Sequence, residues 1–355
     1  MSRKNPANER IKLAYFEFLR QADGKSEPTI RQHEKAISRY EDFTRRADFK
    51  TFGQKQATSF KDHLAQLGLA PATTLTTINI LKRFFGWLAM QPGYKRAIAL
   101  SDIEYLNLSE KDIRAASAPI DHPFPTLSMI ERVVEAMPGE SAIEKRDRAL
   151  IVFTAITGIR DGALVSIKLK HFDPRRMLVL QNPLEVATKF GKRIDTFLFP
   201  MNDAFEALFL DYVRYLRDVE LFADHDPLFP KTAMGQDENR CFVTTGLSRY
   251  HWADASPIRE IFKAAFSAAE LDEFTPHSFR RMIVSEMYAR QLSVSEFKAW
   301  SQNLGHEGAM TTLTSYGKIG MEEQGRLVRD KAKSDEENAP LTRAELDAIL
   351  SKRGL

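Results

Sequence analysis

A proline-rich stretch near the end of the first third of the chain constrains the possible folds most. It separates a part whose residue pattern is helical throughout from a part that mixes helical and strand patterns. Residues 115–125, AASAPIDHPFP, contain three prolines and have neither helical nor strand periodicity, which is typical of a linker between domains. The chain of 355 residues is also too long for one ordinary domain. We therefore expect a first domain over residues 1–119, a second over residues 120–335, and a tail over residues 336–355.

The first domain is predicted to be all helical. Ser26 can cap a helix that has Pro28 in its first turn, and a second helix follows it. A third helix begins near Pro71 and carries apolar residues at helical spacing, which predicts a buried face. Lys82 and Arg83 point away from that face, so they are candidates for contacts with phosphate groups.

Positive charge is concentrated in this first part. Residues 1–120 carry 20 Lys and Arg against 13 Asp and Glu, a net charge of +7, whereas the remaining 235 residues carry 31 against 35, a net charge of −4. This asymmetry favours a polyanionic partner such as DNA. On charge alone, an ordinary solvated surface remains an equal alternative.

The second domain is predicted to be mainly helical, of the α+β type, with a small antiparallel sheet. A helix is expected from Ser128, with Glu131 completing a capping box, and another helix should end at Gly158. Two β-rich runs, 177–181 and 196–199, flank the sequence ATKFGKRID, which predicts a hairpin with its tight turn at Phe190-Gly191.

The tail is predicted to form a short terminal helix. Thr342 and Glu345 have the spacing of a capping box, and Leu346, Ile349 and Leu350 form an apolar set. Such a short helix is only marginally stable in water, so it requires another surface on which to bury that set.

Several classes of protein lose support from the sequence. The single cysteine, Cys241, excludes an internal disulfide and a cysteine-based zinc cluster. No apolar segment is long enough for a membrane span, and the N-terminus lacks the pattern of a signal peptide. Nucleotide-binding, zinc-protease and hydrolase motifs are absent. We therefore expect a cytoplasmic protein that uses no metal and no cofactor.

The candidate chemistry lies in a set of basic and nucleophilic side chains at helix ends and turns of the second domain. The segments that contain them are ITGIRDGAL, ATKFGK, TPHSFRRM and QNLGHEGAMTTLTSYG. The candidate residues are Arg160, Lys189, His277, Arg280, His306 and Tyr316.

These segments resemble, in their order and spacing, the catalytic motifs of the tyrosine recombinases, the phage integrase family. TGIRDGAL is similar to the first-arginine box, PHSFRR to the H-x-x-R box, LGHE to the second-histidine box, TTLTSYG to the nucleophile box, and TKFGK to the hairpin with the catalytic lysine. The helical first domain resembles the core-binding domain that clamps DNA. The resemblance covers roughly residues 10–330 and is strongest to integrases of bacterial mobile elements.

The resemblance implies a site-specific recombinase that acts on double-stranded DNA, associated with the nucleoid. Tyr316 would attack the phosphorus and form a 3′-phosphotyrosine, which conserves bond energy, so neither ATP nor metal is required. Arg160 and Arg280 would stabilise the charge that grows on the phosphate. Lys189 would protonate the leaving 5′ oxygen, and the two histidines would assist proton transfer. The family also implies a homo-tetramer on two DNA sites, in which the tail contacts a neighbouring protomer.

Three alternatives remain open at this point. Lys192 stands close to Lys189 and is the alternative for the catalytic lysine. A type IB topoisomerase would use the same chemistry without strand exchange, so only the DNA products separate the two activities. A DNA-binding protein without catalysis is the third alternative, although the complete set of basic residues and the tyrosine disfavour it.

Overall fold

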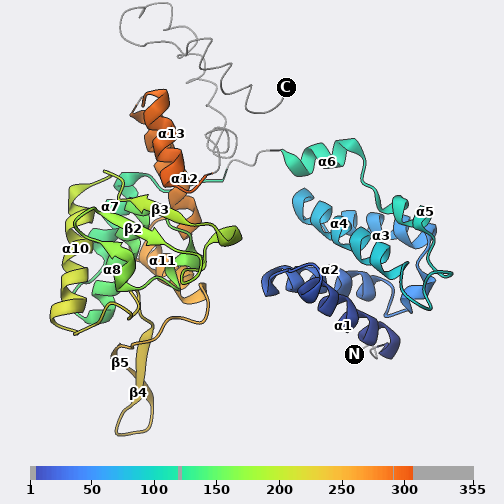
Figure 1. Ribbon diagram of the computed structural model, residues 1–355, viewed down its shortest axis with the longest axis horizontal. Helices are drawn as coiled ribbons and strands as arrows, with labels where there is room; N and C mark the ends of the chain where they lie inside the picture. Colours follow the sequence, from blue (N-terminus) through green and yellow to red (C-terminus); the bar gives the residue numbers. More distant parts are fainter. Residues whose placement is uncertain (1–4, 119–121, 291, 307–355) are drawn as a thin grey trace, which may run out of the picture. The chain divides into compact units, whose positions relative to one another are not determined.

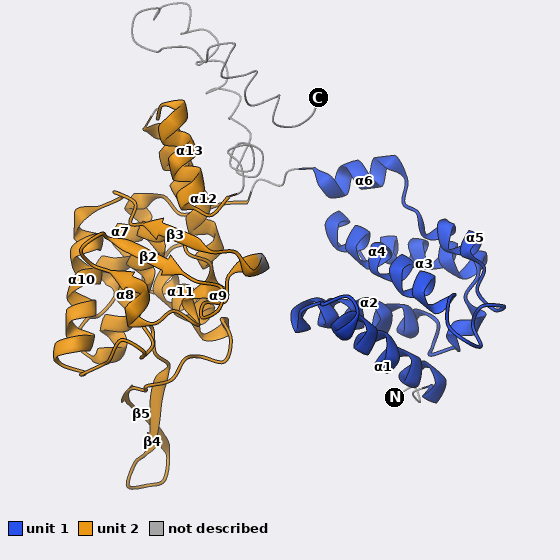
Figure 2. Cartoon of the chain, viewed as in Figure 1, with its two compact units in different colours: residues 1–120 blue, residues 121–355 orange. Residues whose placement is uncertain are grey.

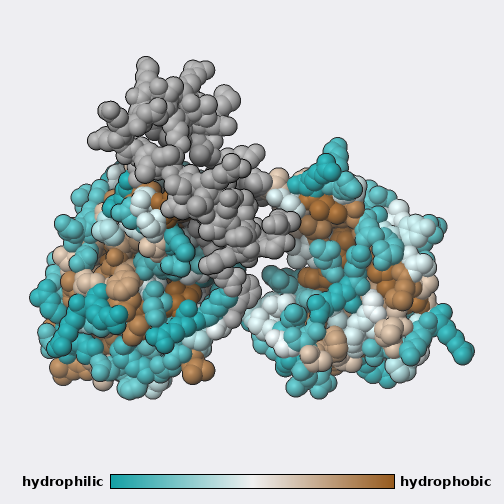
Figure 3. Space-filling view, turned by 45° about the horizontal axis from the view of Figure 1, so that its top comes forward, coloured by the Kyte–Doolittle hydropathy of each residue, from teal (hydrophilic) through white to brown (hydrophobic). Residues whose placement is uncertain are grey.

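The computed structural model describes residues 5–118, 122–290 and 292–306. The chain divides into two compact units, residues 1–120 and residues 121–355 (Figure 2). Polar residues cover most of the visible surface of each unit, with scattered apolar patches between them (Figure 3). Among the described residues, no helix is both long and apolar enough to cross a membrane.

The first unit is all helical in its described part, as predicted (Figure 1). Its elements are α1 (Pro6–Gln21), α2 (Glu27–Phe43), η1 (Phe49–Thr51), α3 (Gln54–Gln66), α4 (Pro71–Leu88), α5 (Leu100–Ile103), η2 (Glu104–Leu106) and α6 (Glu110–Ser117). The second helix starts after Ser26 with Pro28 in its first turn, although the Ser26 hydroxyl contacts Thr29 and makes no capping bond.

Aromatic side chains fill the core of the first unit. Phe85 of α4 stacks on Phe52 with 3.8 Å between ring centroids, and the ring of Tyr40 meets Phe85 edge to face at 5.1 Å. A buried carboxylate, Glu41, accepts a hydrogen bond from Lys12 at 2.7 Å, which ties α1 to α2. Such aromatic clusters combine a large buried area with specific ring geometry, so they fix how the helices pack.

The second unit is mainly helical and also contains two small antiparallel sheets, which confirms the predicted fold class. Its elements are α7 (Leu127–Ala136), α8 (Ala142–Thr157), α9 (Asp161–Leu164), η3 (Leu169–His171), β1 (Phe172–Asp173), β2 (Leu178–Gln181), η4 (Lys189–Gly191), β3 (Ile194–Phe197), α10 (Asp203–Asp218), β4 (Thr232–Gln236), β5 (Phe242–Leu247), α11 (Ser256–Ala268), α12 (Pro276–Ala289) and α13 (Val294–Asn303). The core surrounds α8, whose residues from Ala149 to Thr157 are all buried.

The first sheet has the order β1-β2-β3, and Leu178 of β2 faces Phe197 of β3. The prediction of a tight turn at Phe190-Gly191 is wrong, because the connection between the two strands is much longer. Residues 182–193 connect the two strands, and a single 3-10 turn, η4, lies near the end of this connection. Hydrogen bonds of Glu185 and Ala187 with neighbouring elements hold this long connection in place.

A second hairpin, β4 and β5, was not expected from the sequence. It projects from the body of the unit (Figure 1), and Phe242 and Met234 on it are largely exposed. The start of α7 also differs from the prediction. Thr126, not Ser128, caps this helix by accepting a hydrogen bond from the Met129 amide.

Candidate active site

The site forms around the C-terminal end of α8, where Gly158 adopts the left-handed conformation (φ +58°) expected from the sequence. A Cβ atom at Gly158 would lie 2.7 Å from Leu304 Cδ2 and 2.8 Å from Ile283 Cδ1. Only glycine therefore permits this close packing of α8 against α12 and the end of α13. The close approach brings segments more than 120 residues apart in sequence into one site.

Arg280 lies at the centre of this site and is only 2% exposed. Its Nη1 donates to the Gly158 carbonyl at 2.5 Å, and its Nη2 donates to the Leu304 carbonyl at 2.7 Å and to His306 Nε2 at 2.9 Å. The Nε atom of Arg280 is buried and has no hydrogen-bond partner within the described part of the chain. A buried charged donor of this kind favours an anionic ligand.

His306 follows Gly305, which has a left-handed backbone (φ +71°). Burial, together with the positive charges of Arg280 and Arg160, lowers the pKa of His306 to about 4, so the ring is neutral at neutral pH. A guanidinium can only donate, so His306 Nε2 accepts from Arg280 and the proton of the neutral ring lies on Nδ1.

His277 and Arg160 stand beside this pair. Proline at the first turn starts α12, and His277 lies one helical turn before Arg280 on this helix. Desolvation of the His277 ring and the nearby charges of Arg280, Arg281 and Arg160 lower its pKa. Arg160 occupies the N-cap position of α9 and is half-buried. Both histidines therefore lie within the field of the same two arginines, Arg160 and Arg280.

The connection that carries Lys189 is fixed at two points. Glu185 accepts hydrogen bonds from Lys170 at 2.6 Å and from His171 at 3.2 Å, and these contacts lower the pKa of Glu185 to about 2. The Ala187 amide donates to Ser166 Oγ at 2.8 Å, close to the end of α9. The loop is thereby attached to the segment just after α9, the short helix that begins next to Arg160.

Lys189 is exposed on η4, whereas Lys192 just after it is half-buried, so both lysines are presented on this loop.

Sequence reasoning missed one positioning residue, Asn303. Its amide side chain accepts from the Phe197 amide at 2.7 Å and donates to the Phe197 carbonyl at 2.8 Å. The Thr196 hydroxyl donates to the Asn303 carbonyl at 3.0 Å. These contacts attach the edge strand β3 to the end of α13. In the sequence, the one signal for a role of Asn303 is its position directly before LGHE.

In the first unit, both candidate DNA-contacting cations have partners. Lys82 contacts Asn107 and Glu104, and Arg83 forms an ion pair with Asp23. Sequence reasoning missed a separate polar groove between α2 and α4. Gln32, Lys35, Arg39, Thr73 and Thr76 are among its lining residues.

Tyr316 and the tail helix lie outside the described residues. Within the described ranges, no group of three or more His, Cys, Asp or Glu side chains has the arrangement of a metal site.

Comparison with known proteins identifies the class. The chain matches the model of the Phage integrase family over residues 126–323, which is more than half of its length. It therefore belongs to the phage integrase family, the tyrosine recombinases. The matched region contains all six candidate catalytic positions. The search of curated proteins gives no match.

Solved structures share the fold. A lambda integrase dimer bound to a COC' core site is similar with a TM-score of 0.60 and 15% identity, over 88% of this chain and 96% of that chain. The Tn1549 transposon integrase in complex with transposon right end DNA gives a TM-score of 0.54 and 15% identity, over 91% and 99%. The XerH site-specific recombinase bound to palindromic difH substrate gives 0.56 and 15%, over 90% and 83%.

Proposed function

We propose that this protein is a site-specific DNA recombinase that cleaves and rejoins strands through a 3′-phosphotyrosine on Tyr316. The observation that carries the proposal is the buried guanidinium of Arg280, which two backbone carbonyls and His306 hold in place. Its buried Nε–H donor has no partner among the described residues. A phosphodiester is the anion in DNA that would satisfy this donor.

The fixed orientation of Arg280 supports a role in the transition state. Donors that are already in place when charge develops on a phosphate need no reorganisation during the reaction. Arg160 would be the second cation on the phosphate. His277 and the neutral His306 would assist proton transfer. Lys189, or the neighbouring Lys192, would protonate the 5′ oxygen that leaves.

The first unit would hold the duplex as a clamp. Its net positive charge and the groove between α2 and α4 support this role, because cations and short polar side chains are common in contacts with DNA phosphates and bases. Arg83 stands seven residues after Thr76, so it extends the groove face of α4 by two helical turns. Lys82 points instead towards η2, and its proposed phosphate contact would require it to leave Asn107.

The working assembly would be a homo-tetramer on two DNA sites, with the tail contacting a neighbouring protomer. A dimer and a tetramer on DNA are known for lambda integrase, which has the same fold. A protein that acts on DNA in this way would be found in the cytoplasm, associated with the nucleoid.

Covalent capture tests the proposal. The full chain is incubated, in EDTA and without ATP, with nicked suicide substrates made from the DNA that flanks the gene. We expect a covalent DNA adduct, mapped by mass spectrometry to Tyr316, which disappears in Tyr316→Phe. Tyr250→Phe, at an exposed tyrosine of the same unit, is the matched control and should retain the adduct.

An adduct that persists in Tyr316→Phe would refute the assignment of the nucleophile. The products separate the two related activities. Exchanged flanking sequences indicate a recombinase, whereas relaxed circles alone indicate a topoisomerase.

A further inference from the structure

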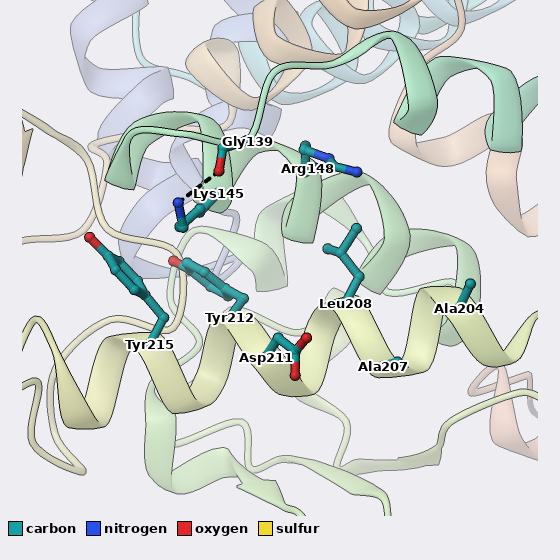
Figure 4. A pocket seen from close by; sticks show the side chains of 9 residues that line it. All are labelled: Gly139, Lys145, Arg148, Ala204, Ala207, Leu208, Asp211, Tyr212 and Tyr215. Carbon is teal, nitrogen blue, oxygen red and sulfur yellow. Dashed lines mark hydrogen bonds between the residues drawn. The ribbon is translucent and has the colours of Figure 1, made fainter.

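A cavity of about 420 Å³ lies between the first turns of α8, the segment before it and one face of α10. Figure 4 shows Lys145, Arg148 and Gly139 on one side and the side chains of α10 on the other. Arg148 lies near the start of α8 and Gly158 follows the end of this helix, so the cavity is separate from the candidate active site.

Arg148 differs from the other cations of α8. Lys145 donates to the carbonyls of Gly139 and Glu140, and Arg146 donates to Asp147 and to the Pro230 carbonyl. For Arg148, the structure over its described residues contains no hydrogen bond and no ion pair, although its Nε atom is fully buried.

Burying a charged donor without a partner is costly. A half-buried guanidinium whose buried Nε has no partner among the described residues therefore favours an anion in the adjacent cavity.

The opposite wall offers apolar surface and aromatic rings. Leu208 lines the cavity together with the rings of Tyr212 and Tyr215. The Tyr212 hydroxyl donates to the Leu228 carbonyl at 3.0 Å and the Tyr215 hydroxyl donates to Glu220 at 2.6 Å. Both hydroxyl groups therefore donate to protein acceptors, and the rings present mainly carbon surface to a ligand.

The remaining charged group of the wall is already balanced. Asp211 forms an ion pair with Arg214, one turn further along α10. The unbalanced charge at the cavity is therefore positive. It belongs to Arg148 and to Lys145, whose ammonium group contacts carbonyls but forms no ion pair among the described residues. An organic carboxylate with an apolar body matches both walls, because the cations lie on one side of the cavity and Leu208, Tyr212 and Tyr215 lie on the other.

We propose that this cavity is a binding site for a small organic carboxylate with an aromatic or aliphatic body. The guanidinium of Arg148 binds the carboxylate, since the planar fork of arginine matches the two carboxylate oxygens. Leu208, Tyr212 and Tyr215 pack against the body of the ligand. The site is distinct from the DNA-cleaving site and does not depend on it.

Two probes of the same shape test the proposal on the full chain without DNA. Isothermal titration calorimetry is carried out with 1-naphthoate and with its neutral analogue 1-naphthamide. We expect saturable binding of 1-naphthoate at one site per chain and an affinity for 1-naphthamide at least tenfold lower. Absence of saturable 1-naphthoate binding, or equal affinity for the two probes, would overturn the proposal.

Variants assign the binding to this cavity. Arg148→Gln removes the charge and should reduce 1-naphthoate binding at least tenfold, whereas Arg175→Gln, at an exposed arginine of the same unit, should not change it. Gly139→Ala keeps the charge but places a Cβ 2.5 Å from Arg148 Nη1, so the guanidinium must move and the affinity should fall. Undiminished binding to Arg148→Gln would refute the site. If this variant does not fold, Gly139→Ala and the two probes decide the question.

Discussion

Substituting Gly158 with alanine tests whether the close packing at the end of α8 holds the candidate active site together. Two costs add at this position. An L-residue in the left-handed region costs about 1–2 kcal/mol. The new Cβ would also lie 2.7 Å from Leu304 Cδ2 and 2.8 Å from Ile283 Cδ1, and overpacking of a tight core typically costs about 1–3 kcal/mol. We therefore expect Gly158→Ala to lower the free energy of unfolding by about 2–5 kcal/mol.

Gly191→Ala is the matched control in the same unit. Gly191 has nearly the same backbone conformation (φ +62°), but a Cβ there would meet no atom within 4 Å among the described residues. It should therefore cost only the backbone share, about 1–2 kcal/mol. Urea denaturation followed by tryptophan fluorescence measures both variants. In a Trp87→Phe background the signal comes from Trp252 and Trp300, and thus from the second unit.

The comparison of the two variants decides the argument. If Gly158→Ala and Gly191→Ala cost the same, the contacts of Gly158 with Leu304 and Ile283 do not constrain the site. If Gly158→Ala costs more, it should also reduce DNA cleavage. The new Cβ displaces the Leu304 side chain and thereby disturbs the Leu304 carbonyl, which accepts a hydrogen bond from Arg280.

Three further predictions concern charge, pH and the first unit. Arg280→Lys keeps the charge but loses the fork that contacts Gly158, Leu304 and His306. DNA binding in a gel-shift assay should remain nearly intact while the cleavage rate falls by about 10²–10³; equal losses would make Arg280 a simple phosphate anchor. The unfolded chain protonates His306 below its ordinary pKa of 6.5, but the folded protein does so only near 4. Stability should therefore fall by up to about 3 kcal/mol as the pH drops through this window, and a similar slope in His306→Gln would refute this. A fragment that begins at Asp121 should fold by circular dichroism but bind DNA more weakly, with a smaller salt dependence than the full chain; equal salt slopes would exclude a clamp role for residues 1–120.

Local backbone chemistry explains which elements were predictable. Gly158 was expected just after the end of a helix, and it has the left-handed conformation that favours glycine. Pro28 in the first turn likewise marked the start of α2, which begins directly after Ser26. These signals depend on a few neighbouring residues, so the sequence alone contains them.

Predictions failed where distant residues decide the outcome. Ser128 and Glu131 have the spacing of a capping box, but Thr126 caps α7 and Glu131 accepts instead from Asn202. The connection before β3 was predicted as a tight turn, whereas contacts such as that of Glu185 with Lys170 hold a much longer loop. A local pattern cannot show that a side chain 71 residues away offers a better partner.

By itself, the sequence determined the class of protein, the helical and mixed parts, and the order of the candidate catalytic residues, because these depend on composition, short motifs and local backbone preference. Only the tertiary structure decided that Arg280 meets the carbonyls of Gly158 and Leu304 and the ring of His306. It also decided that the buried Nε of Arg148 has no hydrogen-bond partner in the described part of the chain, whereas Lys145 donates to the Gly139 carbonyl. The physical reason is that hydrogen bonds and burial depend on which distant segments pack together. The sequence of one helix therefore does not show which of its cations will find an acceptor.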